Sequence, residues 1–138
     1  MRSTARSAAS PRGIPRGSRT TLQHVSVEVE PAKVADCVAF YGLLGFEPVD
    51  PPPALRERAA WVQRAGTQIH LMRQDSPVVM PHGHIALVVD DYDAALERLR
   101  DAGFDPEPRE EHWGAPRSFV HDPAGTRVEL MAAPPTAR

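Results

Sequence analysis

Apolar residues recur at every second position in two short stretches of the chain, each of which begins with a histidine. Residues 24–30 read HVSVEVE and residues 84–90 read HIALVVD. A period of two places every second side chain on one face, so each stretch predicts a β-strand with a single apolar face. Shorter strands are expected by the same pattern near 46–49, 58–64, 67–73, 105–109, 117–121 and 126–131.

Two other segments have helical spacing. Residues 90–104 read DDYDAALERLRDAGF, with an aspartate placed to cap the first turn and Gly103 placed just after the last. Apolar residues three and four positions apart predict a helix between them. Residues 31–41 predict a second helix, with proline tolerated in its first turn. The segments 50–57 and 110–116 are rich in Pro, Glu and Gly and predict loops.

The chain also repeats itself. The two histidine-led strands are displaced by 60 residues, the Gly-Phe-acid-Pro runs at 45–48 and 103–106 by 58, and AGTQIHLM at 65–72 and AGTRVELM at 124–131 by 59. Three landmarks in one order at nearly constant spacing indicate two homologous modules. We assign module one to 21–75 and module two to 82–132, each a strand, a helix and three strands, and predict an α+β fold.

The repeat turns isolated histidines into a candidate site. Two copies of a module commonly pack about a pseudo-twofold axis, which brings equivalent positions face to face. The alignment pairs His24 with His84, and His70 with Glu129. If the aliphatic face of each strand packs on the helices, all four side chains lie on the concave side of the sheet. Three imidazoles and a carboxylate without any thiolate indicate a divalent metal at a catalytic rather than a purely structural site.

One divalent ion per site is expected, chosen among Zn, Ni, Fe, Mn and Co, with open positions for water or substrate oxygens. His70 has an alternative role, in which it orients a ligand or acts as a base. Gln68 and Arg127 share the face of the candidate ligands and are expected to orient an anionic substrate, with Arg117 a weaker candidate. Trp113 lies in a predicted loop and is either a surface residue or part of a lid over the substrate.

Composition narrows the class of protein. The 138 residues are 41% hydrophobic, which suits one domain, and the formal charge of −2 predicts neither a nucleic-acid nor a membrane partner. A single cysteine excludes a disulfide framework, favours a reducing cytoplasm and rules out a thiolate-rich metal site. Residues 1–20 carry five arginines and no acid, and we expect a disordered tail there rather than a transit peptide. Residues 133–138 are expected to form a second short tail.

Three segments, FYGLLGFEPV, GHIALVVDDYDAALERLRDAGF and FVHDPAGTRVEL, resemble the vicinal oxygen chelate superfamily. This superfamily includes glyoxalase I, fosfomycin-resistance enzymes, methylmalonyl-CoA epimerase, extradiol dioxygenases and metal-free bleomycin-binding proteins. The resemblance covers about 21–132. It implies two tandem βαβββ modules that form a curved mixed sheet around a cup, often in a homodimer whose two chains share the cup. It also implies metal ligands at the positions of His24, His70, His84 and Glu129.

The chain departs from each well-known activity of that superfamily. The glyoxalase I pattern would have Glu in place of His70, so Glu129 is left as the one carboxylate for both metal binding and proton transfer. Most extradiol dioxygenases have four modules, and bleomycin-binding members lack the ligand set. The leading interpretation is a metal-dependent lyase or isomerase of glyoxalase type, acting on a small oxygenated substrate by bidentate chelation and proton transfer. Its catalytic candidates are Glu129 and His70.

Two alternatives stay open at this point. The first is an Fe(II)-dependent ring-cleaving dioxygenase that uses His24, His84 and Glu129 as its two-histidine, one-carboxylate triad. The second is a non-catalytic protein that binds a drug or metabolite in the cup. Metal content separates the second alternative from the two enzymes, and oxygen uptake separates the first from the isomerase.

Overall fold

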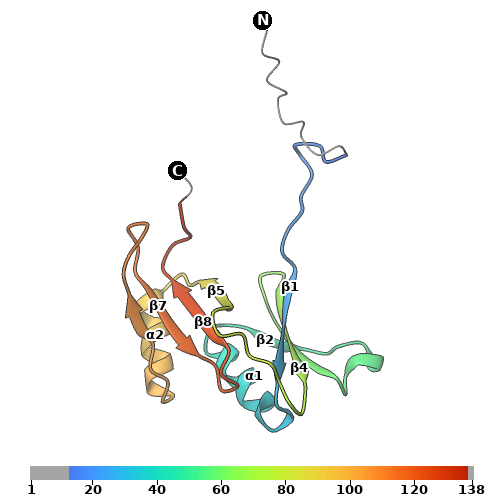
Figure 1. The fold of residues 1–138 in the computed structure, drawn as a ribbon. Helices are drawn as coiled ribbons and strands as arrows, with labels where there is room; N and C mark the ends of the chain where they lie inside the picture. Colours follow the sequence, from blue (N-terminus) through green and yellow to red (C-terminus); the bar gives the residue numbers. More distant parts are fainter. Residues whose placement is uncertain (1–12, 137–138) are drawn as a thin grey trace, which may run out of the picture.

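Each half of the chain builds one four-stranded mixed sheet (Figure 1). The computed structural model describes residues 13–136. The first sheet has the order β1-β4-β3-β2, and the second has the order β5-β8-β7-β6. The strands are β1 (His24–Val29), β2 (Glu47–Val49), β3 (Ala59–Arg64), β4 (Thr67–Arg73), β5 (His84–Val88), β6 (Glu107–Arg109), β7 (Arg117–His121) and β8 (Arg127–Met131). The identical order confirms the predicted α+β fold of two βαβββ modules.

Within each sheet the first and last strands of the module run parallel, and the other neighbours run antiparallel. The parallel pairs β1–β4 and β5–β8 place His24 beside Gln68 and His84 beside Arg127. The strands β1 and β5 each have one paired neighbour, so each leaves one edge without a strand partner in the described chain.

The helix of each module crosses from its first strand to its second. In module one a 3₁₀ turn at Pro31–Lys33 precedes α1 (Val34–Gly42), so the predicted helix begins with a tighter turn that Pro31 initiates. In module two α2 (Tyr92–Asp101) is capped by Asp91, whose side chain accepts a hydrogen bond from the amide of Ala94 at 3.1 Å. The predicted loop at 50–57 contains a short 3₁₀ turn at Pro53–Leu55.

Two different turns close the inner hairpins of the modules. Ala65 and Gly66, with φ of 50° and 80°, form the two-residue turn between β3 and β4. The turn between β7 and β8 is longer and is organised by Asp122. Its Oδ1 accepts hydrogen bonds from the amides of Ala124 and Thr126, both at 2.9 Å. The two hairpins therefore differ in length even though their strands pair in the same way.

Strand parity divides each sheet into an apolar and a polar face. In the first sheet Val25, Ile69 and Val62 lie in one cross-strand row on the apolar face, while Ser26, His70 and Trp61 lie in the next row on the other face. The second sheet is built alike, with Ile85, Val128 and Val120 in one apolar row. The aliphatic residues of both sheets belong to one buried cluster with the helices. The predicted assignment of faces is therefore confirmed.

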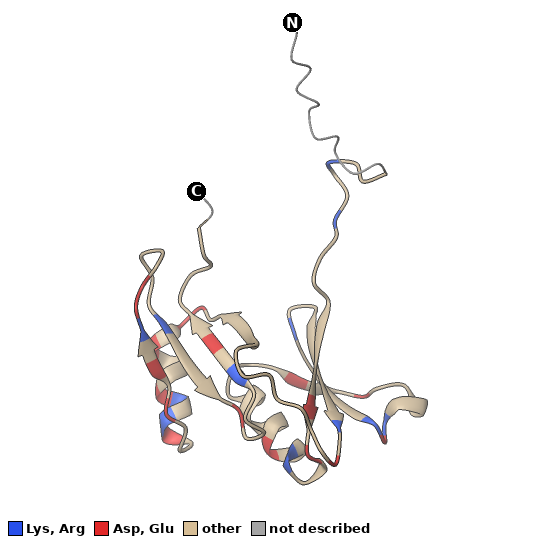
Figure 2. Ribbon diagram, in the orientation of Figure 1, with Lys and Arg blue, Asp and Glu red and all other residues tan. Residues whose placement is uncertain are grey.

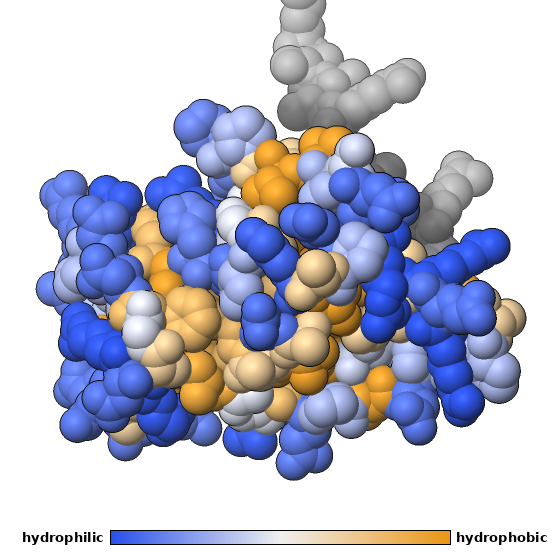
Figure 3. Space-filling model, turned by 90° about the horizontal axis from the view of Figure 1, so that it is seen from below, coloured by the Kyte–Doolittle hydropathy of each residue, from blue (hydrophilic) through white to orange (hydrophobic). Residues whose placement is uncertain are grey.

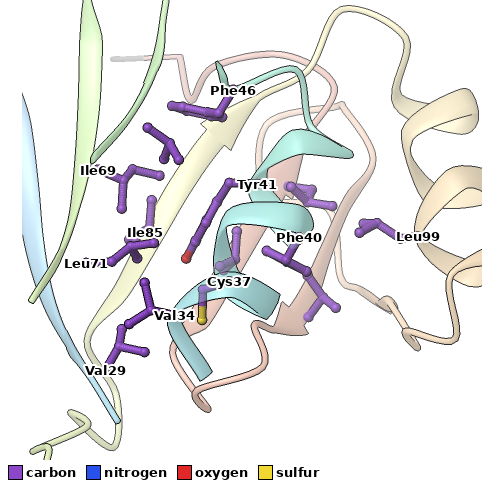
Figure 4. Packing of buried hydrophobic residues seen from close by; sticks show 14 of the residues in the cluster. Val29, Val34, Cys37, Phe40, Tyr41, Phe46, Ile69, Leu71, Ile85 and Leu99 are labelled. Atoms are coloured by element: carbon purple, nitrogen blue, oxygen red, sulfur yellow. The ribbon is translucent and has the colours of Figure 1, made fainter. Parts of the chain in front are cut away.

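The helix α1 lies at the centre of this cluster (Figure 4). Figure 4 shows Phe40 and Tyr41 on α1, with Ile69 and Leu71 of the first sheet on one side and Leu99 of α2 on the other. All five of these side chains are almost completely buried. Burying an aliphatic or aromatic side chain of this size contributes roughly 1.5–3 kcal/mol, so α1 holds the two modules together mainly by apolar contact.

One buried hydrogen bond joins the modules directly. The hydroxyl of Tyr41 on α1 donates to Oδ2 of Asp122 in the β7–β8 turn at 2.8 Å. Burial, together with the nearby Asp122 carboxylate, raises the pKa of Tyr41, and burial raises the pKa of Asp122 although the tyrosine hydroxyl opposes that shift. Burial also raises the pKa of Cys37 to about 12, so this thiol stays protonated at neutral pH.

Apolar residues also reach the surface. Seen from below, they gather in the middle of the molecule between flanks of hydrophilic residues (Figure 3). A groove of about 490 Å³ lies between β1 and β5, and the connecting segment 74–83 contributes Val78, Val79 and Met80 to it. Val78 and Met80 are 70% and 67% exposed. In the part of the chain that the structure describes, no helix combines the length and apolarity needed to cross a membrane.

The Tyr41–Asp122 bond predicts coupling between the modules. We expect Tyr41→Phe to lower the free energy of unfolding by about 1–3 kcal/mol, because Oδ2 of Asp122 is left buried without its donor. Asp122→Ala should cost about 2–4 kcal/mol, and the double variant less than the sum by about 1–2 kcal/mol. Urea denaturation measures all three.

The control is Arg98→Ala. Arg98 also links the modules, through a 3.0 Å hydrogen bond to the carbonyl of Leu43, but this bond is exposed. Its removal should cost less than about 1 kcal/mol. Strict additivity of the Tyr41 and Asp122 changes would contradict a direct coupling.

Candidate functional site

Three aromatic rings stack across the polar face of the first sheet. The ring of Trp61 on β3 lies parallel to that of His70 on β4 at 4.1 Å between centroids, and His70 lies against His24 on β1 at 4.0 Å. His70 is 8% exposed in the middle of the stack, whereas His24 at its end is exposed. Burial, with His24 as a smaller cause, lowers the pKa of His70. His70 is therefore a neutral imidazole at neutral pH, the form that binds metals.

Gln68 fixes the orientation of His70. Its Nε2 donates to Oε1 of Gln63 at 2.8 Å, and its Oε1 lies 2.8 Å from Nε2 of His70. In this arrangement the carbonyl oxygen of Gln68 accepts from Nε2–H of His70, which leaves the lone pair on Nδ1. A metal must therefore bind Nδ1 of His70, or displace Gln68 to reach Nε2.

The stack also restricts how the two histidines can act together. A ring nitrogen binds a metal along its lone pair, which lies in the plane of the ring. The rings of His24 and His70 are stacked at an interplanar angle of 14°, so no nearby point lies close to both planes. One ring must turn before both can bind one ion. His24 is the one that can turn, because it is exposed and its Nδ1 is held only by the neighbouring side chain of Gln23.

A second pair of candidate ligands lies on the polar face of the second sheet. His84 on β5 and Glu129 on β8 face each other, with Nε2 of His84 at 3.8 Å from Oε1 of Glu129. The other carboxylate oxygen, Oε2, lies 3.7 Å from Nε of Arg117 on β7. Figure 2 shows one acidic and one basic position on β8, and these are Glu129 and Arg127 in the sequence of that strand.

The Oε2 atom of this buried carboxylate lies within ion-pair distance of Arg117 but accepts no hydrogen bond. Glu129 is 6% exposed, and its Oε2 has no hydrogen-bond donor. Nε of Arg117 also lacks an acceptor, and within residues 13–136 these are the two buried side-chain atoms left in this state. Buried polar atoms are normally paired, and an unpaired one costs about 1–3 kcal/mol. A cation beside Glu129 and an oxygen beside Arg117 would satisfy both atoms, so the donor set fits a divalent metal with an oxygen-bearing ligand.

The described chain does not bring all four candidate ligands together. His24 meets His70, and His84 meets Glu129, but no three His, Cys, Asp or Glu side chains among residues 13–136 gather closely enough to hold a metal ion. A single chain therefore presents two separate pairs, one on each sheet.

The candidate substrate-binding residues lie on the same two polar faces. Gln68 is in the first sheet, and Arg117 and Arg127 are in the second, each in the cross-strand rows next to a candidate ligand. Trp113 is half-buried in the loop before β7. Its indole N–H donates to the carbonyl of Ala133 at 2.9 Å, and its ring lies 5.7 Å from the guanidinium of Arg117. In this position Trp113 forms a wall beside Arg117.

Two aromatic residues at the site escaped the sequence analysis, namely Trp61 and Phe119. Each pairs across the strands with a candidate ligand, Trp61 with His70 and Phe119 with Glu129. The internal repeat does not align these two aromatic residues with each other, because the β3–β4 turn is shorter than the β7–β8 turn. Trp61 lies nine residues before His70, whereas Phe119 lies ten residues before Glu129.

Phe119 is surrounded by basic side chains. The guanidinium of Arg127 lies 3.8 Å from its ring centre, that of Arg117 lies at 5.1 Å and that of Arg109 at 5.7 Å. The ring of His84 meets the same ring edge-on at 5.4 Å. Contacts of this kind contribute about 0.5–2 kcal/mol each. Arg109 is a further residue of the site that the sequence analysis did not identify.

Comparison with known proteins agrees with this architecture. The model of the Glyoxalase/Bleomycin resistance protein/Dioxygenase superfamily matches residues 21–130. The chain is 29% identical over 123 residues to Glyoxylase I 4 of Arabidopsis thaliana, a match that covers 80% of this chain and 70% of that protein. Because the family model spans most of the chain, the protein belongs to this superfamily.

Solved structures show the same fold. A glyoxalase family protein from Bacillus anthracis superposes with a TM-score of 0.76 at 25% identity, covering 85% of this chain and 98% of that one. Lactoylglutathione lyase from Agrobacterium tumefaciens superposes with a TM-score of 0.64 at 18% identity, covering 82% and 93%. At this distance the second likeness concerns the fold alone.

The aromatic stack supplies an internal reporter for metal binding. The chain has two tryptophans, so Trp113→Phe leaves Trp61, stacked on His70, as the single emitter. We expect Zn²⁺ to change the emission of Trp61 saturably, because binding requires the stacked rings to rearrange. The change should disappear when His70→Ala is added and persist when the exposed His82→Ala is added instead. An emission change that survives His70→Ala would show that the metal does not act through this stack.

Proposed function

We propose that the protein is a metal-dependent enzyme of glyoxalase type, a lyase or isomerase acting on a small oxygenated substrate. The observation that carries the proposal is the buried Glu129 carboxylate on a polar sheet face, whose Oε1 lies 3.8 Å from Nε2 of His84 and whose Oε2 has no hydrogen bond. A cationic neighbour, Nε of Arg117, lies 3.7 Å from Oε2 but makes no hydrogen bond to it, so the carboxylate keeps acceptor capacity for a metal ion beside His84.

The residues proposed to hold the metal are His24, His70, His84 and Glu129. All offer nitrogen or oxygen donors, which suit Zn, Ni, Fe, Mn or Co. When bound, such an ion acts as a Lewis acid on two neighbouring oxygens of the substrate and acidifies the adjacent C–H. His70 enters as a neutral imidazole, and His24 turns out of the stack to join it.

The protein's own groups then move the proton. The Glu129 carboxylate would accept it from the substrate carbon and return it to the neighbouring carbon, while the hydroxyl proton of the substrate passes to its other oxygen, so the isomerisation involves no net oxidation. The Arg117 guanidinium, whose Nε lies 3.7 Å from Oε2 of Glu129, stabilises negative charge that develops on the substrate oxygens. His70 is the alternative base if it does not bind the metal. The walls formed by Trp61, Phe119 and Trp113 limit the access of water.

We also propose that the working unit is a homodimer in which each cup takes one pair of ligands from each chain. Three observations support it. The two pairs do not meet within the described chain, β1 and β5 each have an edge without a partner strand, and apolar residues next to those edges are exposed. A second copy that covers these edges would bring His24 and His70 of one chain to His84 and Glu129 of the other.

Metal analysis with paired activity measurements tests the enzyme proposal. We expect the purified parent protein to contain close to one divalent ion per chain and to consume the hemithioacetal of methylglyoxal and a thiol without oxygen uptake. His84→Ala should lose most of the metal and the activity. The matched control is His82→Ala, two residues before it and also exposed, which should keep both.

Other outcomes separate the alternatives. Oxygen uptake with a catechol would show that the protein is a ring-cleaving dioxygenase and not an isomerase. Negligible metal in the parent and in His84→Ala alike would overturn the enzyme proposal and leave a binding protein.

A further inference from the structure

Three arginines cluster on the polar face of the second sheet, and the fold does not require them. Arg109, Arg117 and Arg127 all lie on the polar face and surround Phe119, which they cover so well that it is 8% exposed. The equivalent face of the first sheet carries no lysine or arginine. There the hairpin register places Ala59 where module two has Arg117, and the repeat places Gln68 where it has Arg127. Because module one folds in the same way without these guanidinium groups, the fold itself does not require them.

Two of these arginines have N–H groups that make no hydrogen bond within the described chain. Arg117 is anchored at one end, where Nη1 donates to the carbonyl of Glu110 at 2.7 Å, while its buried Nε makes no hydrogen bond and lies 3.7 Å from Oε2 of Glu129. The guanidinium carbon of Arg127 lies over the Phe119 ring, 3.8 Å from its centre, and none of the ion pairs within residues 13–136 involves Arg127. A guanidinium that is fixed by stacking keeps its N–H groups free in the ring plane. Arg109 differs, because it pairs with Glu107 at 3.2 Å in an exposed position.

Their place in the sheet puts these donors beside the candidate metal ligands. Arg127 pairs across the strands with His84 and lies two residues from Glu129 on the same face of β8, about 7 Å along the strand. Arg117 reaches Glu129 from the opposite side, with Nε at 3.7 Å from Oε2. A ligand that approaches Glu129 therefore meets the guanidinium of Arg127, on the same strand β8, and that of Arg117, on the neighbouring strand β7.

We infer that Arg127 and Arg117 form an oxyanion-binding site, so that the substrate of the proposed enzyme carries a carboxylate or phosphoryl-type group a few bonds from its reacting oxygens. The orphaned Nε of Arg117 receives one anionic oxygen, and the free edge of Arg127 receives the others in a forked contact. Phe119 is a positioning residue that holds Arg127 in this orientation. That the bound anion belongs to a substrate rests on the proposed function, whereas anion binding by the two arginines does not depend on it.

The test measures anion binding rather than turnover. Inorganic phosphate and acetate are titrated separately into the full-length protein, both as purified and after removal of metal, while the Nε–H signals of the arginines are followed by NMR. We expect at least one anion to bind saturably in both preparations and to shift the signals of Arg127 and Arg117. Saturation by phosphate alone identifies a phosphoryl-type group, and saturation by acetate identifies a carboxylate.

Variants then locate the site. Arg127→Gln should weaken the binding at least about fivefold, and Arg127→Lys, which keeps the charge but loses the fork, should weaken it to an intermediate degree. Arg58→Gln, which makes the same change of charge at an exposed position, should leave it within about twofold. Phe119→Leu should weaken binding while leaving the charge unchanged.

Two results would overturn the inference. One is the absence of saturable binding of either anion to the metal-free protein, and the other is equal weakening by Arg127→Gln and Arg58→Gln. Failure of the proposed function looks different. In that case the protein contains no metal and has no isomerase activity, while phosphate or acetate still binds through Arg127.

Discussion

Six strands, all except the short β2 and β6, give one face to the apolar cluster that contains the helices, and the placement of the polar residues follows from that constraint. Side chains alternate along a strand, so burying Ile69 and Val128 against the core forces His70 and Glu129 onto the opposite face. The helix α1 fills the space between the modules and contributes Phe40 and Tyr41 to both. The apolar core therefore positions the candidate site without including any of its residues.

The same constraint explains how far the sequence predicts this molecule. Periodicity and the internal repeat were sufficient for the two βαβββ modules, for the faces of their strands and for the equivalence of His24 with His84 and of His70 with Glu129. They did not predict that His24 meets His70 on one sheet and His84 meets Glu129 on the other, because the separation of the sheets depends on how α1 packs between them. The stacking of His24 on His70 depends on side-chain rotation, which strand parity does not constrain.

The two polar faces have the same framework and different chemistry. In module one the ring of Trp61 lies flat against a histidine, whereas in module two Phe119 lies among arginines beside a carboxylate. One module thus offers neutral donors and the other offers charge. This asymmetry suits a site in which a cation and an anionic substrate are bound together, with the charges of Glu129 and Arg117 already close to each other.

In the proposed homodimer one cation binds a pair of ligands from each of the two chains. Mixing two variants, each of which lacks one of the pairs, tests this arrangement most directly. Neither His24→Ala/His70→Ala nor His84→Ala/Glu129→Gln should bind metal alone. After the two are refolded together, each mixed dimer has one intact cup, so metal should return to about a quarter of the parent level. If mass spectrometry detects mixed dimers but no metal returns, while the parent binds it, the ligands do not come from two chains.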